Sequence, residues 1–193
     1  MSAMEALLAI VESCPEISSL SFHFYTPHLN VKEKPGVCTS SDLVHHNPIS
    51  NIITLYRPSI TWRTLTYLPE HYSRLGEVMS ILSKIKTGNK IFHLPMMDFD
   101  CSPSQENLDK VTAFLRQVGQ TKGVILSSGR SFHFYGTALS SNEDYLKFLG
   151  ECLLFSGFTD ERYIGHRLID GCGILRISAG GIRQKTPTVV AIL

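Results

Sequence analysis

Segments with the period of an amphipathic helix alternate along this chain with segments that have the two-residue period of a strand. The helical pattern is present at residues 4–12, 69–85, 102–118 and 140–155. The strand pattern is present at residues 17–25, 51–56, 91–97, 123–126, 132–135, 173–178 and 186–193. The alternation is typical of an α+β or α/β domain, and we predict an α+β fold in which a mixed β-sheet is flanked by helices.

The length of the chain limits the number of domains. Its 193 residues suffice for one substantial core and are too few for two ordinary domains, so we expect one domain over residues 1–193. Residues 1–90 are predicted to form a supporting part, and residues 91–193 carry every motif that we relate to chemistry. Residues 26–50 are polar and contain prolines, which predicts a loop.

Charge and cysteine content argue against several classes of protein. Proteins that bind long nucleic acid usually have a marked excess of basic residues, and the net charge of this chain is only +1. Any binding of nucleic acid therefore requires a local basic patch. Five cysteines, without a C-x-x-C pair, fit the reduced thiols of a cytoplasmic protein better than a disulfide framework. Every apolar run is too short to cross a bilayer, so we expect no membrane contact.

The single tryptophan, Trp62, lies near Tyr56 and Arg57. Such a group can stack on the bases of a single strand. Large apolar side chains are more often buried, and we therefore interpret Trp62 as a buried anchor.

Two carboxylates follow the apolar run at residues 91–97, in the triplet Asp98-Phe99-Asp100. Successive side chains of a strand alternate between faces, so Asp98 and Asp100 are predicted to share a face while Phe99 enters the core. Their charges repel unless a cation lies between them, and Mg²⁺ or Mn²⁺ is suited to such oxygen ligands. In the alternative interpretation, Asp100 only caps the helix that follows.

A second motif, Ser-Gly-Arg-Ser-Phe-His-Phe-Tyr-Gly, occupies residues 128–136. Gly129 marks a turn between two strand segments, which predicts a hairpin. Ser131 and His133 are two residues apart and would lie on one strand face. A lone histidine between phenylalanines is more often a core residue, but together with the two aspartates this motif indicates a site for metal and triphosphate.

The order of these motifs resembles the catalytic core of the archaeo-eukaryotic primase superfamily, the primase-polymerase group. The matching pieces are Asp98-Phe99-Asp100, the hairpin motif at 128–133, the acidic segment that begins at Asp160, and Leu-Arg-Ile-Ser at 175–178. The resemblance covers roughly the second half of the chain, from about residue 90 onward. It implies an RRM-like catalytic core within the α+β fold.

The resemblance also implies roles for individual residues. The catalytic, metal-binding carboxylates would be Asp98, Asp100 and a third acid, for which we favour Asp160 over Asp170. The nucleotide-binding residues would be Ser128, Arg130, Ser131, His133, Arg176 and Ser178. The implied cofactor is Mg²⁺ or Mn²⁺. The implied partners are nucleoside triphosphates, a single-stranded DNA or RNA template, and a helicase or accessory subunit.

By this resemblance the protein is predicted to be a DNA primase-type nucleotidyltransferase that adds nucleotides on a template by two-metal phosphoryl transfer. One alternative is a non-catalytic nucleotide- or nucleic-acid-binding module with the same fold. Another is a metal-dependent phosphoesterase that uses the same carboxylates. Two bound divalent ions favour the enzyme over the binding module, and hydrolysis without a template favours the phosphoesterase.

Overall fold

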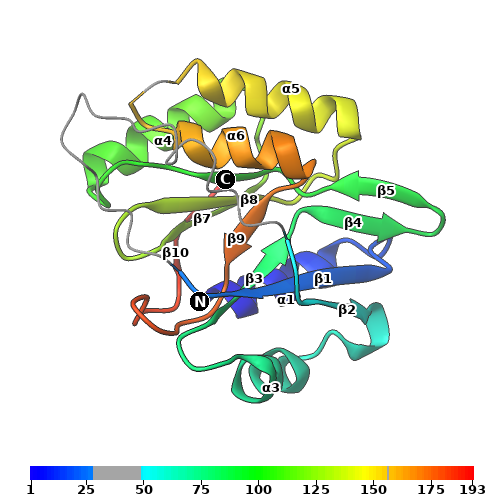
Figure 1. The fold of residues 1–193 in the computed structure, drawn as a ribbon. Coiled ribbons are helices and arrows are strands. Elements are labelled where there is room, and N and C mark those ends of the chain that lie inside the picture. Colours follow the sequence, from blue (N-terminus) through cyan, green and yellow to red (C-terminus); the bar gives the residue numbers. More distant parts are fainter. Residues whose placement is uncertain (28–48, 156) are drawn as a thin grey trace.

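The computed structural model describes residues 1–27, 49–155 and 157–193 (Figure 1), so most of the loop predicted at 26–50 lies outside the described residues. None of the helices in these ranges is long and apolar enough to span a membrane. The elements in chain order are α1 (Ala3–Ser13), β1 (Ser19–Tyr25), β2 (Ile52–Tyr56), a 3-10 turn (Arg57–Ser59), α3 (Trp62–Tyr72), β3 (Val78–Leu82), β4 (Lys84–Thr87), β5 (Lys90–His93), β6 (Met96–Asp98), α4 (Gln105–Gln117), β7 (Gly123–Ser127), β8 (Phe132–Gly136), α5 (Asn142–Leu153), α6 (Glu161–Asp170), β9 (Ile174–Arg176) and β10 (Thr188–Ile192).

The strands form two sheets. The first has the order β5-β4-β1-β3-β9, with β2 also paired to β1, and the second has the order β10-β7-β8-β6. Each pairing among the described strands is antiparallel. Helices α4, α5 and α6 cover the outer face of the second sheet, whereas α1 and α3 lie with the first sheet (Figure 1). The α+β class, with helices flanking the strands, is confirmed, and the strands are divided between two sheets.

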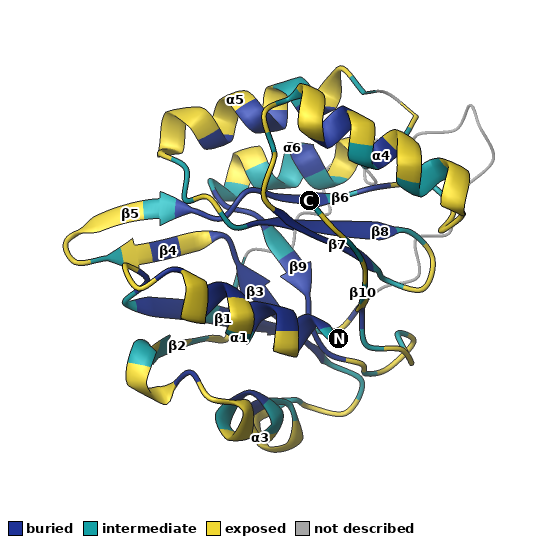
Figure 2. Cartoon of the chain, turned by 180° about the vertical axis from the view of Figure 1, so that it is seen from behind, coloured by how far each residue is buried: buried dark blue, intermediate teal, exposed yellow. Residues whose placement is uncertain are grey.

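The second sheet separates two hydrophobic cores. On β8, Phe132 and Phe134 join a core with side chains of α4, α5 and α6. Tyr135, between the sheets, joins the other core, which includes side chains of α1 and β1. Figure 2 shows β3 and β8 as buried strands, whereas half of β5 is exposed. The same alternation on β6 sends Met97 toward the helices and leaves Asp98, its neighbour, on the face between the sheets.

Helix α1 begins and ends with side-chain hydrogen bonds to the backbone. Ser2 and Glu5 form a capping box at its start, which satisfies otherwise unpaired amide groups. At its end, the Arg57 guanidinium donates to the carbonyl oxygens of Val11 (2.7 Å) and Cys14 (2.9 Å). Arg57 is therefore a structural residue that joins α1 to the turn after β2.

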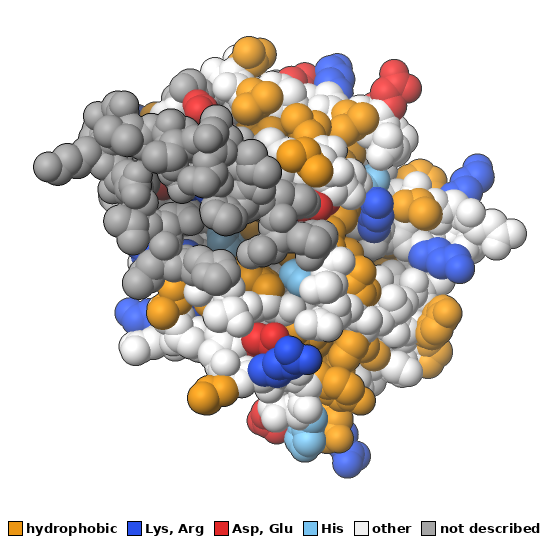
Figure 3. All heavy atoms as spheres, viewed as in Figure 1, with side chains coloured by type: hydrophobic (Ala, Val, Ile, Leu, Met, Phe, Trp, Pro, Cys, Tyr) orange, Lys and Arg blue, Asp and Glu red, His pale blue; other side chains and the backbone are white. Residues whose placement is uncertain are grey.

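The interpretation of Trp62 as a buried anchor is wrong. Its side chain is 50% exposed at the start of α3, and Tyr56 is 64% exposed. Hydrophobic side chains are visible at the lower edge of the surface, where α3 and β2 lie (Figure 3). The anchors of α3 are instead Leu65 and Leu68, which are buried, because they lie on the helix face that meets α1 and the first sheet.

The helix predicted at residues 69–85 is also wrong. Helix α3 ends at Tyr72, and residues 78–82 form β3. Both faces of β3 are buried, so its apolar run lacks the two-residue alternation that distinguishes a strand from a helix. Leu75, which completed the helical spacing, is fully exposed.

Two further segments differ from the prediction. The segment at 91–97 contains two strands, β5 and β6, which belong to different sheets. Pro95 lies between them, at a position where its lack of a backbone N–H interrupts no strand pairing. Helix α6 was not predicted, although Asp160 caps its start and Gly171 ends it in the left-handed conformation, at φ 64°.

Candidate active site

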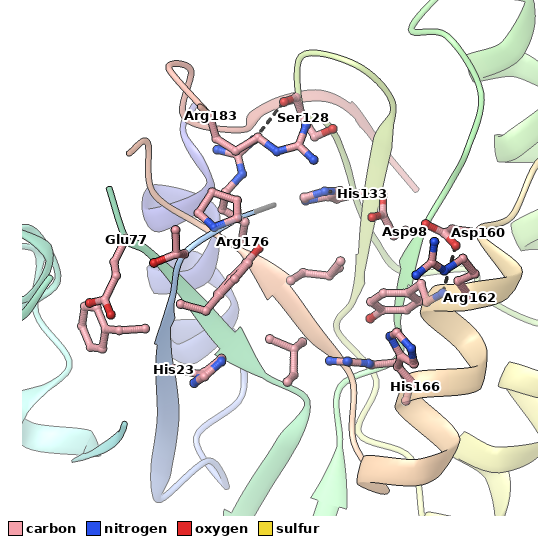
Figure 4. Close-up of a pocket in the computed structure, with 18 of the residues that line it drawn as sticks. His23, Glu77, Asp98, Ser128, His133, Asp160, Arg162, His166, Arg176 and Arg183 are labelled. Atoms are coloured by element: carbon pink, nitrogen blue, oxygen red, sulfur yellow. Dashed lines mark hydrogen bonds and ion pairs between the residues drawn. The ribbon is translucent and has the colours of Figure 1, made fainter. Parts of the chain in front are cut away.

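A pocket of about 680 Å³ lies between the two sheets, beside the start of α6. Strands β1 and β9 of the first sheet contribute to its wall, as do β6 and β8 of the second. In Figure 4, Asp98 and Asp160 lie between Ser128 and Arg183 on one side and His166 on the other. The pocket therefore has a pair of carboxylates on the wall formed by β6 and the start of α6, with basic side chains on both sides of them.

Asp98 is positioned by the pairing of β6 with β8. It lies directly opposite His133 in the register of the two strands. The imidazole Nε2 of His133 is 3.6 Å from Asp98 Oδ1, and the Ser131 hydroxyl donates to the same oxygen at 3.4 Å. The sheet thus brings together three residues that the sequence predicted to share a site.

Asp160 is positioned by the start of α6. Its Oδ1 accepts a hydrogen bond from the backbone N–H of Tyr163 at 2.9 Å, as an N-cap residue does. Its own N–H donates to the carbonyl oxygen of Asp98 at 3.1 Å, which joins α6 to the end of β6. The structure therefore brings Asp98 and Asp160 together from elements about sixty residues apart in sequence.

The electrostatic environment of Asp98 disfavours its negative charge. Burial and, to a smaller extent, the neighbouring charge of Asp160 raise the pKa of Asp98 to about 7, although Arg183 and the Ser131 hydroxyl oppose the change. The two carboxylates repel each other when both are charged, and a bound cation or a proton reduces that repulsion.

Asp100 and Asp170 lie outside the lining of this pocket. Asp100 is exposed, and its N–H donates to the carbonyl oxygen of Phe158 at 2.7 Å. Asp170 is at the other end of α6, where its Oδ2 is 3.0 Å from Nη2 of Arg167. In the ranges that the structure describes, no cluster of three or more His, Cys, Asp or Glu side chains is arranged to hold a metal ion.

His133 is a neutral imidazole in this environment. Burial, followed by the charges of Arg176 and Arg183, lowers the pKa of His133 to about 3. Its side chain is 7% exposed, and its Nδ1 has no hydrogen-bond partner among the described residues. A buried polar atom without a partner costs free energy, and a ligand that occupies the pocket can remove that cost.

Arg176 holds the backbone around the pocket in place. Its buried guanidinium donates to the carbonyl oxygens of Ser128 (2.9 Å), Ser178 (2.7 Å) and Lys185 (2.6 Å). It lines the pocket, but these contacts occupy most of its donors. Its charge therefore reaches the pocket mainly as a positive potential.

The remaining predicted nucleotide-binding residues have different positions. Ser128 lines the pocket, and its hydroxyl is 3.0 Å from that of Ser131. Arg130 is exposed at the hairpin turn and lies outside the pocket lining. Ser178 is buried away from the lining, where its hydroxyl accepts from the N–H of Met79 at 2.8 Å.

Sequence reasoning missed Arg183, which lines the pocket. It closes a tight turn with Gly180, in which each N–H donates to the other's carbonyl oxygen at 2.9 Å. Gly181 has φ 50°, and a Cβ there would collide with the carbonyl oxygen of Gly76. The consecutive glycines were the available signal, because they allow a positive φ and a close backbone approach.

Sequence reasoning also missed Arg162, His166 and Arg167 on α6, and His23 on β1, all of which line the pocket. The first and second are four residues apart, which places them on one face of a helix. This spacing became informative only once residues 161–170 were known to be helical.

Comparison with known families identifies the family of this chain. The family described as archaeo-eukaryotic primase 1D-like matches residues 67–188, which is more than half of the chain. The chain belongs to the archaeo-eukaryotic primase 1D-like family. The matched range of this primase-like protein includes β6, β8, α6 and β9, which carry most of the pocket, and the predicted superfamily is confirmed. No curated protein and no solved structure matches the chain.

Proposed function

We propose that this primase-like protein is a nucleotidyltransferase that adds nucleotides on a single-stranded DNA or RNA template. The observation that carries the proposal is the arrangement of one pocket: Asp98 and Asp160 lie beside Ser131 and His133, with Arg183 across from them. Family membership supports a primase-polymerase type of domain. The volume of about 680 Å³ is in the range of pockets that hold small-molecule ligands such as a nucleotide.

The donor chemistry of Asp98 and Asp160 fits Mg²⁺ or Mn²⁺. These ions prefer oxygen ligands, and Mg²⁺ is commonly held by one or two carboxylates together with substrate phosphates and water. The raised pKa of Asp98 supports the assignment, since burial and the charge of Asp160 make a cation favourable there. When bound, the ion would neutralise charge on the phosphate oxygens of the reacting nucleotide.

The remaining pocket residues would bind and orient the triphosphate. The Ser131 hydroxyl and the neutral imidazole of His133 would supply hydrogen bonds beside the carboxylates. Arg183 would supply positive charge from the opposite side, where charge-assisted hydrogen bonds to phosphate are strong. Arg176 would keep Ser128 and the turn before Lys185 in position through its three carbonyl contacts.

The proposal is tested by extension of a primer on a single-stranded template, with labelled nucleotides and either Mg²⁺ or Mn²⁺. We expect product from the native protein, none from Asp98→Ala, and roughly a hundredfold less from His133→Ala, by analogy with the loss of one stabilising group from an active site. Asp109→Ala, on the exposed face of α4, is the matched control and should retain activity. Product that persists in Asp98→Ala would contradict the proposed site.

A non-catalytic nucleotide-binding module is the second candidate. The observation that favours it is the position of Asp100, which is exposed outside the lining of the pocket. This candidate predicts nucleotide binding that does not depend on metal, with no extension under either ion. Release of phosphate without a template would instead support a phosphoesterase.

A further inference from the structure

Strands β4 and β5 form a hairpin that carries a local concentration of positive charge. Lys84 and Lys86 on β4 and Lys90 on β5 are exposed. The sequence has no acidic residue between Glu77 and Asp98, and none of the three lysines forms an ion pair with a carboxylate in the described part of the chain. Basic side chains gather over this hairpin in the space-filling view (Figures 1 and 3). The hairpin is therefore a local basic patch on a protein of nearly zero net charge.

The hairpin projects from the molecule but is firmly attached to it. In both Figure 1 and Figure 2 it extends beyond the helices that cover the second sheet. Ile85, between the two lysines of β4, is fully buried. The carbonyl oxygen of Lys86 accepts from the N–H (2.9 Å) and the hydroxyl (2.6 Å) of Ser18. These contacts fix β4, and because side chains two residues apart on a strand share a face, Lys84 and Lys86 are presented together on its outer face.

The base of the hairpin lies at the end of α6 that is away from the carboxylate pair. The Lys84 ammonium group is 3.8 Å from the place that a Cβ would take at Gly171, the residue that ends α6. Asp160 caps the other end of α6 and lines the pocket. The ten residues of α6 rise by about 15 Å, which corresponds to about four to five base pairs of a duplex. A duplex that ends at the carboxylates and follows α6 therefore brings its backbone to Lys84.

The side chains of the hairpin favour phosphate over bases as the group that they bind. A lysine ammonium group is a compact point charge that contacts phosphate without reading the sequence. Sites for single strands combine such charges with exposed aromatic rings on which the bases stack. On the hairpin, Phe92 is only partly exposed and His93 is buried. Charges without a stacking surface fit the backbone of a duplex, whose bases are already stacked on one another.

We propose that the β4–β5 hairpin binds the sugar-phosphate backbone of the primer–template duplex, about four to five base pairs from the primer end. The inference rests on the proposed function, because nucleotidyl transfer on a template leaves a duplex beside the carboxylate pair. The hairpin holds this duplex by charge and independently of its sequence. Duplex affinity therefore depends on salt through the three lysines, since each phosphate contact releases counterions.

The test measures duplex affinity in the absence of nucleotide, so that no turnover occurs. Fluorescence anisotropy of a labelled DNA primer–template is recorded over a range of NaCl concentrations. The native protein is compared with a triple variant that combines Lys84→Gln, Lys86→Gln and Lys90→Gln. Each lysine–phosphate contact contributes about 0.9 to the slope of log affinity against log salt, so the slope of the triple variant should be smaller by about 2.7. An unchanged slope would overturn the proposal and leave the lysines as protection of an edge strand against pairing.

Two controls separate the charge of the hairpin from its fold. The combination of Lys84→Arg, Lys86→Arg and Lys90→Arg retains the charge and should retain the native slope. Lys110→Gln removes a lysine of α4 whose charge Glu106 already balances at 2.6 Å, and it should leave the slope unchanged. Circular dichroism of each variant shows whether the fold is intact. A slope that falls as far with arginine as with glutamine would contradict a role based on charge.

A scan of the duplex locates the contact. Pairs of backbone phosphates are replaced by uncharged methylphosphonates at successive distances from the primer end. We expect the replacement to weaken binding to the native protein most at about four to five base pairs from that end. The triple glutamine variant should lack this maximum, because both changes remove the same interaction. Identical profiles for the two proteins would refute the contact.

Failure of the hairpin contact is distinguishable from failure of the proposed function. A native protein that extends primers, while the triple glutamine variant keeps the native slope, retains the function and refutes the contact. A native protein whose slope depends on the hairpin, but which extends no primer, keeps the contact and refutes the transferase. Absence of duplex binding by the native protein refutes the contact whatever the extension assay shows.

Discussion

His93 is a buried histidine that lies away from the pocket and whose neighbours require it to be neutral. Its Nδ1 is 3.0 Å from the Ser83 hydroxyl, and its ring is stacked on Tyr145 at 4.4 Å between centroids. The same hydroxyl accepts from the N–H of Gly173 at 2.7 Å, so its own proton is available to His93. Burial and, to a smaller extent, the charge of Lys84 lower the pKa of His93 to about 4.

This histidine predicts a loss of stability in acid. His93 takes up its proton near pH 6.5 in the unfolded chain and only near pH 4 in the folded chain. The stabilisation that neutral His93 gives to the folded state is therefore complete above pH 6.5 and is lost as the pH falls toward 4. The free energy of unfolding lost through His93 should be of the order of 2 kcal/mol. Urea unfolding at several pH values should therefore give a shallower pH dependence for His93→Gln than for the native protein.

The matched control for that measurement is His71→Gln, because His71 is exposed on α3. It should leave the pH dependence of the unfolding free energy unchanged. If His93→Gln and the native protein lose stability in parallel between pH 6.5 and 4, the proton is taken up elsewhere and the role given to His93 is wrong.

Among the elements, the turn at residues 180–183 determines where Arg183 lies. Gly181 adopts φ 50°, and its Cα faces the carbonyl oxygen of Gly76 in the turn before β3. Two loops that are about a hundred residues apart thus approach each other through backbone alone. This contact is possible because Gly181 carries no Cβ.

Substitution at this turn should affect both stability and nucleotide binding. Gly181→Ala introduces a Cβ at a positive φ and against the Gly76 carbonyl, so we expect a loss of about 1 to 3 kcal/mol in unfolding free energy. Displacement of Arg183 should also raise the KM for nucleotide more than it lowers kcat. Gly150→Ala, in the open part of α5 with no atom near the added Cβ, should be neutral or slightly stabilising.

Most elements could be predicted from periodicity, and the failures have physical causes. Helix α4 has an amphipathic pattern because one of its faces meets a core. The hairpin β7–β8 is buried on both faces, and its signal was the turn at Gly129 between two apolar runs. Strand β3 is buried on both faces and has no such pattern. The predicted shared face of Asp98 and Asp100 assumed a continuing strand, but β6 ends at Asp98, so the two-residue period no longer orients Asp100.

At the scale of the whole molecule, the pocket joins the two sheets. His23 and Arg176 come from the first sheet, and Asp98 and His133 come from the second. The Tyr135 hydroxyl of the second sheet donates to the carbonyl oxygen of Arg176 in the first at 3.1 Å. Local patterns predicted the strand segments that contain His23, His133 and Arg176, but only the packing of the sheets places Arg183 and the face of α6 at the same cavity.

A ligand that fills this pocket should therefore stabilise the molecule as a unit. Nucleoside triphosphate with Mg²⁺ or Mn²⁺ at a hundred times its Kd should add about 2.7 kcal/mol, because it binds only when both sheets are docked. Calorimetry should show one transition whose Tm rises with ligand concentration. Asp98→Ala should abolish the metal-dependent part of the rise. If calorimetry instead shows two transitions and the Tm of only one rises with ligand concentration, the ligand contacts a single sheet.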